Sequence, residues 1–271
     1  MIRTVRSATD GTQLAVDVTG DAAAPAIVLL HAIPLDRSTW DAQAERLARR
    51  ARVIRFDHRG LGGSEVPKGP YLMETLAGDL ADVLDATGVA KAVVVGHSLG
   101  GFVTYAFYRM FAERVMSLGI VQSRASADTP EQIATREALA DRIEREGVSA
   151  LDDAFVPDFL ARSRYTEDPE MGARLRALVR ATNPRGAAAM LRGMATRTAS
   201  HDLFPEIAVP TTIVAGTADA FTSPDELRSD AAAIAGATYE LLPCGHLPQW
   251  EAPQALGDVL ERLLDAAIAR A

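Results

Sequence analysis

The chain contains the stretch Val93-Val94-Val95-Gly96-His97-Ser98-Leu99-Gly100-Gly101, in which G-x-S-x-G follows an apolar run and precedes a helical pattern at Phe102–Phe111. This order predicts a buried strand, a sharp turn and a helix. A serine on such a turn has a strained backbone, and side chains at Gly96 and Gly100 would collide with it. The helix directs its N-terminal N–H groups and the positive end of its dipole toward Ser98. Ser98 is therefore the candidate nucleophile.

A serine hydroxyl needs a base to remove its proton, so the histidines are the next candidates. His246 lies in Pro243-Cys244-Gly245-His246-Leu247-Pro248, a glycine-containing loop after the last expected strand. Sites of α/β proteins assemble at the carboxyl ends of their parallel strands. We therefore predict that His246 is the base. We interpret His97 as packing behind the turn, because neighbours there point in different directions, and His201 as an exposed residue without a partner.

The base in turn needs an acid that holds its tautomer and stabilises the imidazolium. The apolar run Thr211–Ala215 leads into Gly216-Thr217-Ala218-Asp219, which places Asp219 at another strand end. Asp219 is the preferred acid, and Asp128 and Asp225 are the alternatives. Because Asp219 also precedes a helical pattern, capping that helix is its competing interpretation.

Short β-rich runs alternate with amphipathic ones along most of the chain, which predicts an α/β fold. Several runs are continuously apolar, as expected for strands buried on both faces of a parallel sheet. We therefore expect a mostly parallel, eight-stranded sheet with helices on both faces. The expected strands are Ile2–Ser7, Leu14–Val18, Ala26–Leu30, Val53–Phe56, Ala92–Val95, Ser117–Val121, Thr211–Ala215 and Thr238–Leu242, and the expected helices are Trp40–Arg49, Thr75–Thr87, Phe102–Phe111 and Pro253–Ala269.

Residues 124–202 interrupt this alternation, because they contain helix starts but no β-rich run. Thr129-Pro130-Glu131-Gln132 has the pattern of a capping box, and Asp168-Pro169 and Asn183-Pro184 repeat a capping residue followed by proline. These signals predict about four helices inserted after the sixth strand as a lid. The expected organisation is a core of residues 1–123 and 203–271 with a helical cap of residues 124–202.

Composition excludes several classes of protein. The 36 acidic and 28 basic residues give a net charge of −8, which argues against a nucleic-acid or anionic membrane surface. The longest strongly apolar run is too short to span a bilayer, and the first residues lack the apolar run of a signal peptide. The single cysteine, Cys244, rules out an intrachain disulfide and favours a reducing, cytoplasmic setting. Cys244 and His246 alone are a poor zinc signal, so we expect neither a metal nor a cofactor.

Taken together, these motifs resemble α/β-hydrolase fold enzymes along nearly the whole chain. The order Ser98, Asp219, His246 is the one that this family uses. His31-Ala32-Ile33-Pro34 resembles its H-G-x-P turn, and this resemblance implies that the backbone N–H groups of Ile33 and Leu99 form an oxyanion hole.

A closer resemblance is to the 3-oxoadipate enol-lactonase group and its esterase relatives. It rests on Ser38-Thr39-Trp40-Asp41-Ala42-Gln43, on Gly63-Ser64-Glu65-Val66-Pro67-Lys68-Gly69-Pro70-Tyr71 and on the length of the helical insertion. The resemblance implies a serine hydrolase, monomeric or homodimeric, that acts on a small-molecule ester or lactone. Because Ser98 stands where dehalogenases and epoxide hydrolases of this fold carry a carboxylate, those chemistries are excluded.

Three other functions of the same fold stay open from sequence: a cofactor-free perhydrolase or haloperoxidase, an enzyme of carbon–carbon or hydroxynitrile cleavage, and a non-catalytic ligand receptor. We expect the substrate pocket between the sheet edge and the cap. Arg124 is a candidate for binding a substrate carboxylate, with an ordinary surface arginine as the competing interpretation. The candidate substrate-binding residues are Trp40, Phe102, Arg124, Phe155, Phe159, Met190, Met194, Leu247 and Trp250.

Overall fold

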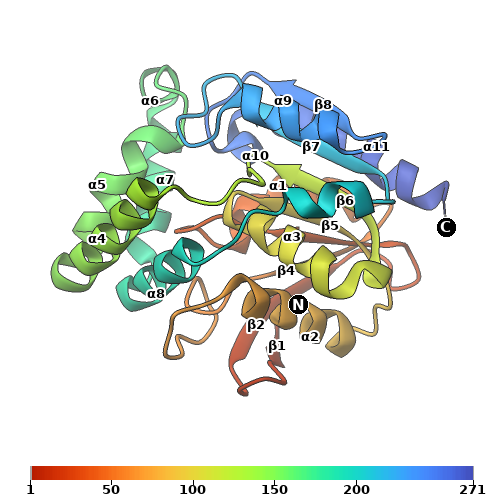
Figure 1. Ribbon diagram of the computed structural model, residues 1–271, viewed down its shortest axis with the longest axis horizontal. Coiled ribbons are helices and arrows are strands. Elements are labelled where there is room, and N and C mark those ends of the chain that lie inside the picture. The colour runs from red at the N-terminus through yellow and green to blue at the C-terminus, as the bar shows by residue number, and fades with distance from the viewer. Residues whose placement is uncertain (1, 271) are drawn as a thin grey trace.

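The expected α/β fold is confirmed. A computed structural model describes residues 2–270 and contains one eight-stranded sheet in the order β1-β2-β4-β3-β5-β6-β7-β8 (Figure 1). Strands β1, β2 and β4 pair antiparallel, and every other neighbouring pair is parallel. The strands are β1 (Ile2–Arg6), β2 (Gln13–Thr19), β3 (Ala26–Leu30), β4 (Arg52–Phe56), β5 (Ala92–His97), β6 (Val115–Val121), β7 (Thr211–Gly216) and β8 (Thr238–Leu242).

The central strands are buried on both faces, as their continuous apolar runs predict. Every residue of β3 and β5 is buried. Because side chains alternate along a strand, Val28 and Leu30 join one hydrophobic core while Ile27 and Leu29 join the other. The sheet is therefore the middle layer of three.

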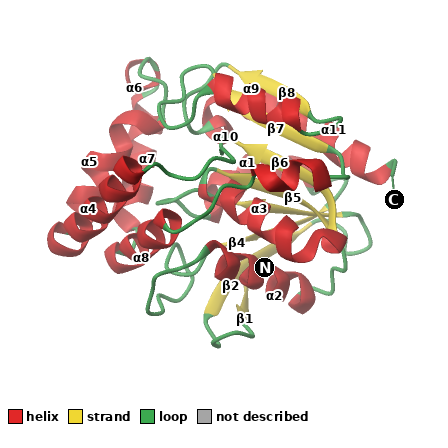
Figure 2. Cartoon of the chain, viewed as in Figure 1, coloured by secondary structure: helices red, strands yellow, loops and turns green. Residues whose placement is uncertain are grey.

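Helices form the two outer layers (Figure 2). Helices α2, α3 and α9 contribute to the core on one face, and α1 and α11 contribute to the core on the other. Turns of 3-10 helix connect some of these elements. The bounds are α1 (Asp41–Leu47), α2 (Met73–Ala86), α3 (Leu99–Phe111), α9 (Pro224–Ala233), α10 (Pro248–Glu251) and α11 (Pro253–Ile268), with 3-10 turns η1 (Arg37–Trp40), η2 (Ala112–Arg114) and η3 (His201–Glu206).

Five further helices lie between β6 and β7 in the chain. They pack together on one side of the sheet and its covering helices (Figure 1). We call residues 130–195, which contain them, the cap. All three expected starts are confirmed: Thr129 forms a capping box, Asp168 accepts from the Met171 N–H, and Asn183 caps the last helix. The one-turn α6 is the helix beyond the expected number. The bounds are α4 (Pro130–Glu146), α5 (Val148–Phe159), α6 (Arg164–Glu167), α7 (Pro169–Ala181) and α8 (Pro184–Ala195).

Two glycines of α8 bring the cap backbone into contact with the core. A Cβ on Gly186 would lie 1.9 Å from the carbonyl oxygen of Gly60, and one on Gly193 would lie 1.8 Å from that of Tyr71. Real Cβ atoms do not approach a backbone oxygen this closely, so these two positions of α8 accept only glycine. The loop between β4 and α2 thus carries one side of the cap.

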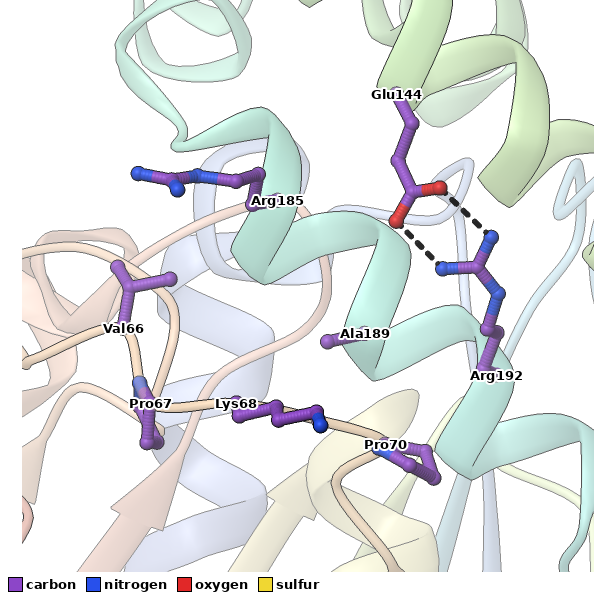
Figure 3. A pocket seen from close by; sticks show the side chains of 9 residues that line it. Val66, Pro67, Lys68, Pro70, Glu144, Arg185, Ala189 and Arg192 are labelled. Atoms are coloured by element: carbon purple, nitrogen blue, oxygen red, sulfur yellow. Dashed lines mark hydrogen bonds and ion pairs between the residues drawn. The ribbon is translucent and has the colours of Figure 1, made fainter.

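A cavity of about 480 Å³ opens where this loop meets α4 and α8 (Figure 3). Glu144 on α4 and Arg192 on α8 form an ion pair at 2.7 Å at its edge, and Lys68 lies on the loop across from them. None of the predicted site residues lines this cavity. Across residues 2–270, no helix combines the length and apolar character that crossing a membrane requires.

Candidate active site

Ser98 occupies the sharp turn between β5 and α3 with φ 52° and ψ −111°. Its N–H donates to the carbonyl of Val121 at 2.9 Å, and its carbonyl accepts from the Gly101 N–H at 2.9 Å. The flanking glycines are required by contact, because a Cβ on Gly96 would lie 2.1 Å from the Gly100 carbonyl oxygen. The sequence therefore produces the strained turn that its glycine pattern predicts.

His246 and Asp219 come together at the carboxyl edge of the sheet. Nδ1 of His246 lies 2.9 Å from each carboxylate oxygen of Asp219, and both side chains are buried. Asp219 also accepts the N–H groups of Phe221 at 2.8 Å and Thr222 at 3.2 Å, which fix the plane of its carboxylate. With Nδ1–H donating to Asp219, Nε2 of His246 is left as the basic nitrogen.

The competing assignments for the acid have other surroundings. Ser223, and not Asp219, occupies the N-cap position of α9, so Asp219 shapes the preceding loop instead of capping the helix. Asp128 is held by three guanidinium groups, those of Arg124, Arg136 and Arg197. Burial opposes the ionisation of Asp128, but these cations, led by Arg136, keep its pKa below the usual value.

His97 links the serine turn to the loop of His246. Its Nε2–H donates to the backbone carbonyl of His246 at 2.7 Å, and the two rings lie 5.0 Å apart. Burial lowers the pKa of His97 well below the usual value, so the imidazole is neutral and donates a single N–H. Because His97 is the residue before Ser98, the candidate base is anchored one residue from the candidate nucleophile. His97 thus has a contact that the packing interpretation did not anticipate.

The two predicted oxyanion donors lie at adjacent strand ends. Leu99 is the first residue of α3, where backbone N–H groups have no acceptor within the helix. Ile33 follows β3, which pairs with β5 so that Leu30 is opposite Gly96. A Cβ on Gly100 would lie 2.6 Å from the Leu30 carbonyl oxygen, so the end of β3 touches the serine turn.

Two phenylalanines contact the imidazole of His246, and a third packs against them. The ring centroid of Phe159, from α5, lies 5.2 Å from that of His246, and that of Phe221 lies 4.8 Å away. Phe155 stacks on Phe221 at 6.4 Å. Phe155 and Phe159 were expected from sequence, whereas Phe221 was missed, although its position two residues after Asp219 is a usable signal. The cap and the loop of Asp219 therefore build one apolar wall.

The other predicted pocket residues have separate environments. Trp250 lies under the Arg174 guanidinium at 4.0 Å, beside a cavity of about 460 Å³. Phe102 lies under the Arg197 guanidinium at 3.9 Å. Arg124 pairs with Asp128 instead of standing free. The remaining four are buried: Trp40, Met190, Met194 and Leu247.

Sequence reasoning did not foresee the contacts of two further polar residues and misread one histidine in part. Gln122 donates its amide N–H to the Gly245 carbonyl at 2.6 Å, and Glu251 accepts from backbone N–H groups on both sides of His246. His201 is exposed as expected, but the expectation that it has no partner was wrong, because its Nε2 lies 3.2 Å from a carboxylate oxygen of Asp230. Within residues 2–270, no three His, Cys, Asp or Glu side chains are grouped as metal ligands.

Residues 25–253 match the family described as the alpha/beta hydrolase fold. The chain belongs to this family. This α/β hydrolase is 34% identical to a thermophilic esterase from Thermogutta terrifontis, with a TM-score of 0.94 over 98% of this chain and 99% of the other.

Two enol-lactonases are also similar to this α/β hydrolase. The enol-lactonase of Burkholderia xenovorans LB400 is 31% identical, with a TM-score of 0.89 over 98% of this chain and 100% of the other. The 3-oxoadipate enol-lactonase 1 of Acinetobacter baylyi is 29% identical over 90% of both chains. The resemblance to the esterase and enol-lactonase group is thereby confirmed, and these relatives are hydrolases that act on carboxylic esters.

Proposed function

We propose that this chain is a serine hydrolase that cleaves a small carboxylic ester or lactone through an acyl-enzyme. The observation that carries the proposal is the buried hydrogen bond from His246 Nδ1 to Asp219, in a loop anchored beside the turn that presents Ser98. The esterase and enol-lactonase relatives support carboxylic esters as the substrate class.

Each proposed residue has one role in the reaction. Nε2 of His246 takes the Ser98 proton as Oγ attacks the carbonyl carbon, and Asp219 stabilises the imidazolium that forms. The backbone N–H groups of Ile33 and Leu99 hold the oxyanion, a contribution of roughly 3–4 kcal/mol per donor in comparable enzymes.

The remaining steps return the site to its starting state. The tetrahedral intermediate collapses, the bond to the leaving oxygen breaks, and the imidazolium gives its proton to the alcohol. Water then attacks the acyl-enzyme with His246 again as base. The bond from the acyl carbon to Oγ breaks, the acid is released, and the imidazolium returns its proton to Ser98. In a lactone the alcohol stays tethered to the acyl group, so one product leaves instead of two.

The proposed pocket lies between a core of residues 1–123 and 203–271 and a lid of residues 124–202, and this lid contains the cap. Phe159 and Phe221 supply an apolar wall against the imidazole, with Phe155 packed on both, and this wall suits an acyl chain. The single cysteine, Cys244, supports a cytoplasmic setting, because it rules out an intrachain disulfide. Burial raises the pKa of its thiol to about 12, which leaves it unreactive.

The test is the initial rate of hydrolysis of p-nitrophenyl acetate, butyrate and octanoate by the wild type and Ser98→Ala. We expect the variant to lose about 10⁶-fold in kcat, as for other triad serines. Ser117→Ala is the matched control, because Ser117 is also buried but lies within β6. Equal rates in the wild type and Ser98→Ala would overturn the proposal.

The same protein preparation distinguishes a restricted lactonase and two of the alternatives that sequence leaves open. A wild type that is inactive on the nitrophenyl esters but opens lactones in a Ser98-dependent reaction is a restricted lactonase. Peroxide-dependent halogenation that exceeds hydrolysis indicates the haloperoxidase alternative. Tight ligand binding without turnover indicates a receptor.

A further inference from the structure

The loop that carries His246 has its backbone polar groups bonded from several directions. The carbonyl of His246 accepts from His97 at 2.7 Å, and the carbonyl of Gly245 accepts from Gln122 at 2.6 Å. The N–H of His246 donates to the carbonyl of Phe159, at the end of α5, at 2.8 Å. One N–H group on each side of His246 remains, and a single side chain accepts a hydrogen bond from both.

That side chain is the carboxylate of Glu251, at the end of α10. Its Oε2 accepts from the N–H of Gly245 at 3.0 Å, and its Oε1 accepts from the N–H of Leu247 at 3.2 Å. Glu251 is only 6% exposed, so the bonds are shielded from water. The carboxylate therefore bridges the residues on both sides of His246.

The same carboxylate also holds the cap. Oε2 accepts the N–H of Ala161, the second residue after α5, at 2.9 Å. Arg164 of α6 donates to the backbone carbonyl of Glu251 at 3.2 Å. A Cβ on Gly245 would lie 2.2 Å from the Ala161 nitrogen, so the cap backbone rests directly on this loop and only glycine fits there.

Burying a charged carboxylate costs free energy unless hydrogen bonds compensate for the lost water. Burial raises the pKa of Glu251, while the N–H groups of Gly245, Ala161 and Leu247 act in the opposite direction. Removing this acceptor would leave three buried N–H groups unpaired, each costing about 1–3 kcal/mol. A hydrophobic residue would avoid the cost of burying the charge but would leave both the loop and the cap without their shared acceptor.

We propose that Glu251 is a positioning residue that fixes His246 against Asp219 and makes this geometry depend on docking of the cap segment 159–161. This inference rests on the proposed function, in which His246 is the base. It follows that this edge of the cap stays fixed on the core during turnover.

The decisive variant is Glu251→Gln, which keeps the shape but replaces one acceptor oxygen with an NH₂ group. We expect kcat for p-nitrophenyl butyrate to fall by about 10²-fold with little change in KM, because a displaced base weakens the chemical step more than binding. The acidic limb of the pH profile of kcat/KM is expected to move to lower pH. A looser bond to Asp219 and the loss of a nearby negative charge both destabilise the imidazolium.

The matched control is Asp79→Asn, the same carboxylate-to-amide change at another buried position. Asp79 lies on α2 and pairs with Arg59 at 2.6 Å, so its loss lowers stability without touching the His246 loop. We expect the folded control to keep the wild-type kcat and the wild-type position of the acidic limb in the pH profile of kcat/KM. The burst of p-nitrophenol gives the concentration of active sites to which each rate is normalised.

Arg164→Ala provides a second variant, which removes the cap-side bond to the Glu251 carbonyl together with a partly exposed ion pair to Glu167. We expect a smaller fall in kcat, and this variant provides the test if Glu251→Gln does not fold. Unchanged kcat and an unmoved limb in the folded variants would overturn the inference. Activity that survives in Ser98→Ala would instead overturn the proposed function, so the two failures are distinguishable.

Discussion

Ser98 and Gln122 are the non-glycine residues with positive φ within residues 2–270, at 52° and 47°. They end the neighbouring strands β5 and β6, and each turns a polar group toward the same edge of the sheet. The strain at Gln122 is held by its N–H, which donates to the Val214 carbonyl at 2.8 Å. Its amide in turn holds Gly245. Such backbone strain persists where the surrounding structure fixes it, and it concentrates at functional sites.

At this scale the role of Asp219 can be tested directly. We expect Asp219→Asn to lower kcat by about 10⁴-fold, because the amide no longer holds the imidazole tautomer that leaves Nε2 basic. Asp225→Asn is the control, since Asp225 is the alternative acid in the same region of sequence. Steady-state kinetics on p-nitrophenyl butyrate measures both. A near-normal kcat for Asp219→Asn together with a large loss for Asp225→Asn would reassign the acid.

At the scale of elements, local sequence signals located strands and helix starts well. The runs Ala26–Leu30 and Thr238–Leu242 coincide with β3 and β8, and the capping residues Thr129, Asp168 and Asn183 stand where their helices begin. Apolar runs and caps act over a few residues, so sequence alone reveals them.

The docking of α8 was not visible in the sequence, because it depends on which backbone its glycines meet. We expect Gly193→Ala to lower the free energy of unfolding by about 1–3 kcal/mol, since the new methyl group has to displace α8 from Tyr71. Gly78→Ala is the control, a helical glycine in α2 whose Cβ would meet nothing within 4 Å. Gly78→Ala is expected to raise the free energy of unfolding by about 0.5–1 kcal/mol. Urea unfolding measures the free energy of both variants. Equal effects of the two substitutions would contradict the close contact of Gly193 with Tyr71.

At the scale of the whole molecule, sequence motifs identified the candidate triad, but they did not reveal the hydrogen bonds that hold the loop of His246. Ser98, Asp219 and His246 each follow a recognisable strand in a recognisable motif. The bonds from His97 to His246 and from Ala161 to Glu251 join residues 149 and 90 positions apart. No local pattern encodes such pairs, because they exist only once the sheet order and the cap position are set.

These contacts imply that the cap and the core unfold together. Trp250 of α10 stacks under Arg174 of α7, so its fluorescence reports the docked cap, whereas Trp40 is fully buried in the core. We expect one urea midpoint for far-UV circular dichroism and for tryptophan fluorescence, as in a two-state transition. In Trp250→Phe only Trp40 reports, and its midpoint should match the circular dichroism of the same variant. An earlier fluorescence change in the wild type that is absent from Trp250→Phe would show that the cap detaches first. In that case the contacts of α8 and Glu251 hold the cap more weakly than the core holds itself.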